Sequence, residues 1–135
     1  MKYKRIIMYI VFLVTSCNNE EVSNNKDLGQ NMMDLRIYQE NLGDYIKAKV
    51  PEEGAWLLEG MDSILLILNK KFKDHPRLSA PFSYYYKKDL QEPISGIREA
   101  IYNKDTAKAL RNYRILINGC NDCHIEHEID KEVKF

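Results

Sequence analysis

Two cysteines and a histidine near the C-terminus have the spacing Cys-x-x-Cys-His, formed by Cys120, Cys123 and His124. Two thiols at this spacing can add across the two vinyl groups of a porphyrin and form thioether bonds. The histidine that follows then lies over the iron and can bind it through a ring nitrogen. On a helix, Cys120 and His124 are one turn apart on one face, and Cys123 borders that face. The motif therefore predicts one covalently bound haem c per chain, with its iron bound by His124.

The same residues allow three other interpretations. A Cys-x-x-Cys pair can be a thioredoxin-like redox centre, but that centre requires a βαβ setting, and this pair ends a helical pattern. Cys120, Cys123, His124 and His127 could be half of a zinc site, although structural zinc sites draw their ligands from two separated pairs. A disulfide between the cysteines would give His124 no role. The haem interpretation is the one that uses all three residues of the motif.

The first 17 residues have the pattern of an export signal. Three basic residues among the first five precede an apolar run at positions 6–14, which is too short to span a membrane. Small residues then precede Cys17, as in a bacterial lipobox, where the cysteine is acylated and becomes the new N-terminus. We therefore predict a lipoprotein signal peptide at 1–16 and a lipid on Cys17. An ordinary signal peptide with a passenger cysteine is the alternative.

These predictions divide the chain into three parts. A lipidated flexible tether follows the signal peptide at 17–26, because these residues are polar and lack apolar periodicity. One folded domain occupies 27–135. The protein would be exported to the periplasmic side or cell envelope and held at a membrane by its lipid anchor. Removal of the signal leaves 17 basic and 20 acidic residues, a net charge of −3, which argues against a nucleic-acid partner and allows a basic redox protein.

Apolar residues recur at helical spacing through the whole folded part. The pattern predicts helices at 27–47, 51–75, 81–103 and from 105 to about 128. Asp27 and Asp105 are suitable N-caps, and Pro93 predicts a kink or break in the third helix. Short loops between four long helices indicate an all-α, antiparallel up-down-up-down four-helix bundle, with the haem near the C-terminal end of the last helix.

The bundle geometry suggests a sixth iron ligand. At 1.5 Å per residue, Met32 lies ~7 Å from the start of the first helix and His124 ~5 Å before the end of the last. These two ends are neighbours in an up-down-up-down bundle, and Met32 lies on the inward stripe, whereas Met33 points about 100° away. Met32 is therefore predicted to bind the iron opposite His124. The alternative is that Met32 is ordinary core, since methionine fills gaps well.

The stretch at 107–124, which reads AKALRNYRILINGCNDCH, resembles the monohaem four-helix-bundle cytochromes c, the group that includes cytochrome c′. Residues 27–32 are similar to the opening of related soluble bundle cytochromes, where a methionine of the first helix binds iron. The resemblance implies a covalent haem with these residues: Cys120, Cys123, His124 as proximal ligand and Met32 as distal ligand. Some relatives carry a basic residue four positions after the proximal histidine, where this chain has Glu128.

Two functions follow from this one fold. If Met32 closes the sixth position, the iron is six-coordinate and the protein is an electron carrier that serves redox partners. If Met32 supplies only apolar bulk, the iron is five-coordinate and could bind NO or CO, as in cytochrome c′. A haem-free lipoprotein that scaffolds partners is a third class. No carboxylate pair, nucleophile–base set or phosphate loop is evident, so we do not expect an enzyme. The sequence neither requires nor excludes a homodimer.

Overall fold

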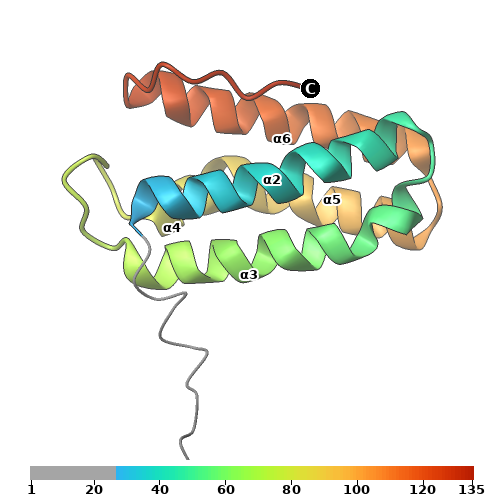
Figure 1. Cartoon of the computed structure of the whole chain (residues 1–135), viewed down its shortest axis with the longest axis horizontal. Helices are drawn as coiled ribbons and strands as arrows, with labels where there is room; N and C mark the ends of the chain where they lie inside the picture. The colour runs from blue at the N-terminus through green and yellow to red at the C-terminus, as the bar shows by residue number, and fades with distance from the viewer. Residues whose placement is uncertain (1–26) are drawn as a thin grey trace, which may run out of the picture.

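The computed structural model describes residues 27–135, which form helices and no strands. Four helical segments lie side by side (Figure 1). In chain order they are α2 (Leu28–Lys47), η1 (Pro51–Gly54) continuing into α3 (Ala55–Lys71), the third segment α4 (Phe82–Tyr85), η2 (Tyr86–Leu90) and α5 (Gln91–Tyr102), and finally α6 (Thr106–Glu126). None of these helices is both long enough and apolar enough to cross a bilayer. The predicted signal peptide, the tether and Cys17 lie outside the described residues.

Side-chain caps set the starts of the first and last helices. Asp27 accepts from the Gln30 backbone N–H at 2.8 Å, and the Gln30 side chain accepts from the Asp27 N–H at 3.0 Å, which completes a capping box. Asp105 accepts from the Lys108 N–H at 2.8 Å. Both predicted N-caps are confirmed. They were predictable because a cap depends on residues only three positions apart.

The second helix is shorter than the sequence predicted. It opens with the 3₁₀ turn η1 and ends at Lys71, so the expectation of a helix to residue 75 was wrong. Phe72 leaves the helix with φ −102° and ψ 61°, and its side chain is buried with 6 % exposure. Its carbonyl accepts from the Phe82 N–H at 2.9 Å. Burial of Phe72 and this long-range hydrogen bond end the helix one turn early.

A kink or break was predicted at Pro93, but Pro93 lies within the continuous helix α5, and a π-helix replaces the regular pattern one turn earlier. Pro93 has no N–H to donate to the carbonyl of Asp89, four residues before it. The helix widens into the π-helix η2, in which the Gln91 N–H bonds to the Tyr86 carbonyl. Both Pro93 and the neighbouring Ile94 are buried. The helical segment therefore continues past Pro93, with a local change of hydrogen-bond pattern before it.

Three helices are followed, two positions after their last residue, by a residue with positive φ that is not glycine: Lys49, Lys104 and Glu128, at 65°, 55° and 53°. Each stands at the first non-helical position of a Schellman motif. At the end of α5, for example, the Asp105 N–H bonds to the Ala100 carbonyl at 2.8 Å, and the Lys104 N–H bonds to the Ile101 carbonyl at 3.2 Å. The hydrogen-bonded turn holds each residue in a left-handed conformation that its Cβ disfavours.

Replacing Lys104 with glycine should stabilise the domain. Glycine removes the Cβ strain of the left-handed conformation, although its greater freedom in the unfolded chain offsets part of the gain. We expect a net gain of roughly 0.5–1 kcal/mol in the free energy of unfolding, measured by urea denaturation. Lys104→Ala is the matched control, because it removes the lysine side chain and keeps the Cβ. An equal gain in both variants would show that the lysine chain, and not the backbone conformation, is responsible.

A buried polar contact joins α2 to α6 in the middle of the bundle. The Tyr113 hydroxyl donates to the Gln39 backbone carbonyl at 2.8 Å and also accepts from the Gln39 side-chain amide. Tyr113 is 1 % exposed, and its burial raises the pKa of the phenol to about 12. The ring fits because Gly43 has no side chain, since a Cβ there would lie 2.2 Å from the tyrosine oxygen. This contact fixes the position of α6 relative to α2 along the bundle axis.

Candidate functional site

The Cys-x-x-Cys-His motif lies in the last two turns of α6. Both thiols are free, and Cys120 and Cys123 are each partly buried. Cys120 packs against the hydrophobic core. Immediately before it, Gly119 is buried where α6 passes the π-helix, so that a Cβ on Gly119 would lie 2.6 Å from the Asp89 carbonyl oxygen. The missing Cβ lets the two helices approach closely at the first cysteine.

The surroundings of the cysteines do not favour thiolates. Burial raises the pKa of Cys120 to about 12, with the neighbouring Cys123 as the next cause. Burial also raises the pKa of Cys123 to about 11, followed by the negative charge of Glu126. A thioredoxin-like redox pair needs a lowered thiol pKa, so the raised pKa values of these two thiols do not favour that role.

The imidazole of His124 contacts the C-terminal segment of the chain. Its Nδ1 lies 2.6 Å from the backbone carbonyl oxygen of Lys131. A carbonyl oxygen only accepts hydrogen bonds, so Nδ1 carries the proton, and in the neutral ring the lone pair is on Nε2. The sequence predicted that His124 belongs to the buried face of α6. It is instead half-buried, with one nitrogen turned to the C-terminal segment.

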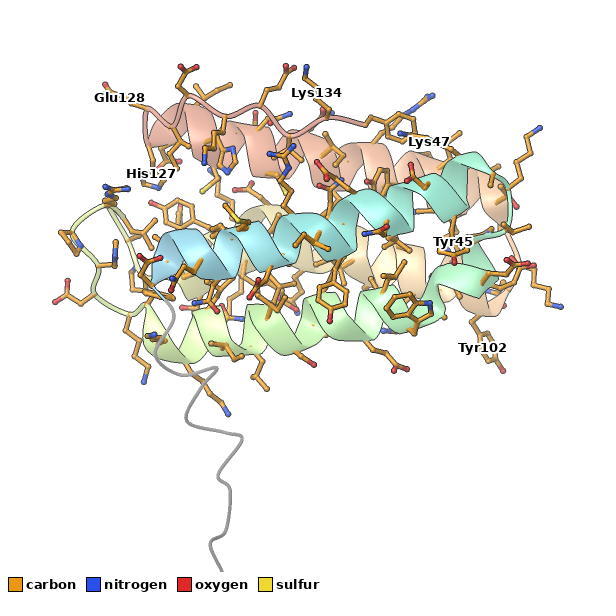
Figure 2. The ribbon with its side chains drawn as sticks, in the orientation of Figure 1. Tyr45, Lys47, Tyr102, His127, Glu128 and Lys134 are labelled. Carbon is orange, nitrogen blue, oxygen red and sulfur yellow. The ribbon has the colours of Figure 1, made fainter. Side chains whose placement is uncertain are left out.

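Residues 129–135 run back along α6 after the chain reverses at Glu128 (Figure 1). The Asn121 side chain makes two hydrogen bonds with the Val133 backbone, donating to its carbonyl at 3.0 Å and accepting from its N–H at 2.7 Å. Phe135 packs on Tyr113 with ring centroids 5.4 Å apart. Figure 2 shows Lys134 well back along the helix from Glu128. No contact between this segment and α6 was predicted, although the alternation of Val133 and Phe135 with charged residues was a signal for it.

Met32 lies on α2 and packs, partly buried, against the same core as Cys120. Its neighbours on the inward stripe, Leu28 and Leu35, are also only partly buried. Farther along the same stripe, Leu42 and Ile46 are 0 % and 1 % exposed. The core is therefore closed toward the end of α2 and incompletely covered at its start. Met33 is 60 % exposed, as its predicted direction requires.

The two remaining histidines lie near the same end of the molecule. His127 packs on the Tyr85 ring at 5.0 Å, with its Nε2 buried and without a hydrogen-bond partner. His75 accepts from the Arg77 N–H at 3.2 Å and packs on Phe72. Within residues 27–135, no three His, Cys, Asp or Glu side chains are grouped so that they could hold one metal ion.

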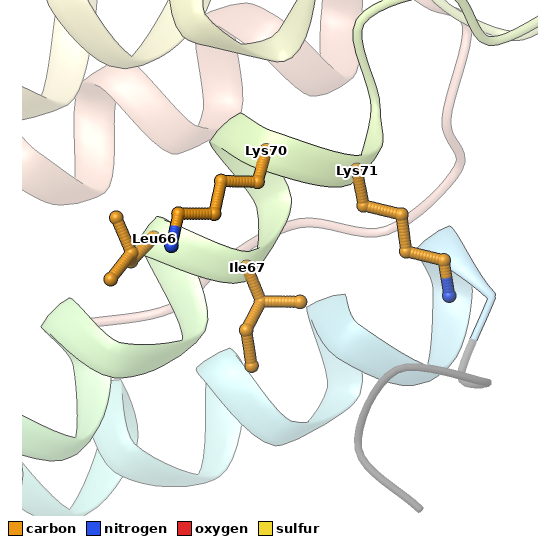
Figure 3. A pocket seen from close by; sticks show the side chains of 4 residues that line it. All are labelled: Leu66, Ile67, Lys70 and Lys71. Atoms are coloured by element: carbon orange, nitrogen blue, oxygen red, sulfur yellow. The ribbon is translucent and has the colours of Figure 1, made fainter. Parts of the chain in front are cut away.

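Two surface hollows lie away from the motif. One is lined by Leu66, Ile67, Lys70 and Lys71 on α3 (Figure 3). The other lies between α2 and α3, and its lining includes Ile37, Tyr38 and Gly60. None of the motif residues lines either hollow, so neither forms part of the candidate site.

In comparisons with known proteins, no family model, no curated protein and no solved structure matches this chain.

Proposed function

We propose that this protein is an electron carrier with one covalent haem c, attached through Cys120 and Cys123. The proposal rests on one observation: the Cys-x-x-Cys-His motif on α6 has two free thiols and a histidine held by one ring nitrogen. Both thiols are free, and the hydrogen bond from His124 Nδ1 to Lys131 leaves Nε2 for a metal. Iron-binding histidines commonly donate their other ring N–H to a carbonyl in this way.

The donor set suits a haem better than a zinc ion. Thioether formation takes two thiols at separate vinyl groups and one histidine at the iron, so it does not need three side chains that converge on a point. The haem supplies the one-electron chemistry when bound, and the protein holds it, excludes water and tunes it.

The finer architecture belongs to the same proposal. We infer an antiparallel up-down-up-down bundle, which the connections at 48–50 and 103–105 favour because so few residues cannot cross the molecule. The start of α2 and the end of α6 lie at the same end of the molecule (Figure 1), and Met32 and His124 belong to these two helix ends. The partly covered stripe of Leu28, Met32 and Leu35 would then line the haem, with Met32 as the distal ligand.

Export and lipid anchoring complete the proposal. A c-type haem is attached outside the bacterial cytoplasm, which agrees with the signal pattern before Cys17. Cys17 would carry the lipid, and the tether at 18–26 would hold the haem domain near a membrane. Redox proteins are the partners that a tethered electron carrier requires. The resemblance to bundle cytochromes c remains part of this proposal.

A visible spectrum tests the function directly. The full chain is produced with a cytochrome c maturation system, and its spectrum is recorded oxidised and reduced, with and without CO. We expect a low-spin spectrum that CO does not change, because Met32 would occupy the sixth coordination position of the iron. A high-spin spectrum that shifts with CO would replace electron transfer by NO or CO binding. A colourless protein would refute the haem and favour a scaffold.

Replacing Met32 with alanine should leave the sixth coordination position of the iron without a protein ligand. The distal thioether is lost, so we expect a change from low spin to high spin and new binding of CO. Met33→Ala is the matched control, because Met33 is the adjacent residue and is 60 % exposed. Spectra of both variants decide the point. A low-spin Met32→Ala protein that still ignores CO would show that another residue is the ligand.

A further inference from the structure

The C-terminal segment contacts two residues of the haem motif itself. The Lys131 carbonyl accepts from His124 Nδ1, and the Val133 backbone pairs with Asn121, one of the two residues between the cysteines. Of residues 129–135, only Val133 packs against the hydrophobic core, where its side chain is partly buried. The segment is therefore positioned to act on the motif.

The segment is held at both ends as well as in its middle. At its start, Glu128 adopts φ 53°, and the Ile129 N–H bonds to the His124 carbonyl at 2.8 Å. At its end, the Phe135 ring lies on Tyr113 and beneath two cations, with Lys47 Nζ 4.9 Å and the Arg114 guanidinium 5.4 Å from its centroid. Cations over an aromatic face are attracted by its quadrupole. These contacts hold residues 129–135 against the rest of the domain.

The contact between Asn121 and Val133 sets the position of the segment along the axis of α6. Asn121 offers its amide N–H and carbonyl to the Val133 carbonyl and N–H, so it pairs with the segment as a neighbouring strand would. Lys131 lies two residues before Val133, and its carbonyl meets His124 one helical turn after Asn121. A shift of the segment along α6 would break all three hydrogen bonds together.

We propose that residues 129–135 form a strap that fixes the proton of His124 on Nδ1 and its Nε2 toward iron, with Asn121 as the positioning residue that holds the strap. The part of this inference that concerns iron rests on the proposed function. Donation from Nδ1 to a carbonyl makes the other nitrogen a stronger ligand and orients the ring. A stronger nitrogen ligand favours oxidised iron, so the strap lowers the midpoint potential.

The test uses the full chain and two pairs of variants. Asn121→Ala removes both links to Val133, and Asn118→Ala, an exposed asparagine on the same helix, is its control. Val133→Pro removes the Val133 N–H without touching α6, and Val133→Ala keeps that N–H. Circular dichroism checks the folding of each variant. Because Val133→Pro changes only the segment, it remains informative if Asn121→Ala disturbs the helix.

Two readouts separate the strap from the haem proposal. In the chain produced without haem, nitrogen NMR of the His124 ring should show mostly the Nδ1–H form, with a smaller share in Asn121→Ala and Val133→Pro. In the loaded chain, the midpoint potential should rise in these two variants and stay at the wild-type value in the controls. An unchanged tautomer share and potential in both variants would overturn the strap. A wild-type chain that takes up no haem would refute the proposed function, and the tautomer share would still decide whether the strap holds His124.

Discussion

Replacing Cys120 and Cys123 together with serine should abolish covalent haem attachment completely. Serine is similar in size to cysteine but has no thiol to add to a vinyl group, so neither thioether can form. We expect no haem staining of the denatured chain on a gel, compared with one haem per chain in the wild type. Each single variant should keep one thioether and a reduced yield. The fold should persist, because neither thiol takes part in a disulfide.

The third cysteine of the chain provides the matched control. Cys17→Ser removes the proposed lipidation site and leaves the motif on α6 unchanged. This variant should lose incorporation of labelled fatty acid and stop partitioning with membranes, and it should still carry haem. The two sets of variants therefore separate the anchor from the cofactor. Haem staining that survives the double replacement in a denatured chain would contradict covalent attachment at these cysteines.

Gly119→Ala should destabilise the bundle, because the closest atom that the new Cβ would meet belongs to the backbone. An added Cβ would lie 2.6 Å from the Asp89 carbonyl oxygen, which belongs to the backbone and cannot turn away as a side chain can. Either α6 or the π-helix must move. Overpacking of this kind costs about 1–3 kcal/mol, and it outweighs the roughly 0.5–1 kcal/mol that alanine gains over glycine inside a helix. Urea denaturation should show a loss of about 1–2 kcal/mol in the free energy of unfolding.

Gly29→Ala is the control, because it makes the same chemical change at the start of α2. The nearest atom to an added Cβ there is Asp27 Oδ1 at 3.4 Å, an ordinary contact distance. Its effect should be neutral or stabilising, opposite in sign to that of Gly119→Ala. A Gly119→Ala protein as stable as the wild type would mean that the helices separate without cost. Because Gly119 precedes Cys120, the same variant should also lower the yield of attached haem.

The sequence alone was sufficient for features that depend on neighbouring residues. The Cys-x-x-Cys-His motif, the N-caps at Asp27 and Asp105 and the inward stripes of the helices each lie within a few consecutive turns. A change of hydrogen-bond pattern near Pro93 was predictable for the same reason, since proline acts on the carbonyl four residues before it. These signals are enough to predict four helices and the position of the motif on the last one.

Tertiary structure decided the features in which distant parts of the chain meet. The second helix ends at Lys71 because the Phe72 side chain enters the core and its carbonyl bonds to Phe82. Gly119 became significant only when α6 was placed against Asp89. Trp56 also illustrates the limit, because it is 58 % exposed although a large apolar ring usually predicts core.

The hydrogen bond of His124 is the clearest case of information that the sequence did not provide. Its acceptor is the backbone carbonyl of Lys131, and every residue of the chain has such a carbonyl. No side-chain pattern could therefore identify which one the imidazole would meet. The type of residue determined which group can bind iron, and the path of the backbone after Glu128 decided how that group is held. The chemistry of a side chain is given by its residue type and is known from the sequence. A backbone contact between separate segments exists only once the chain has folded.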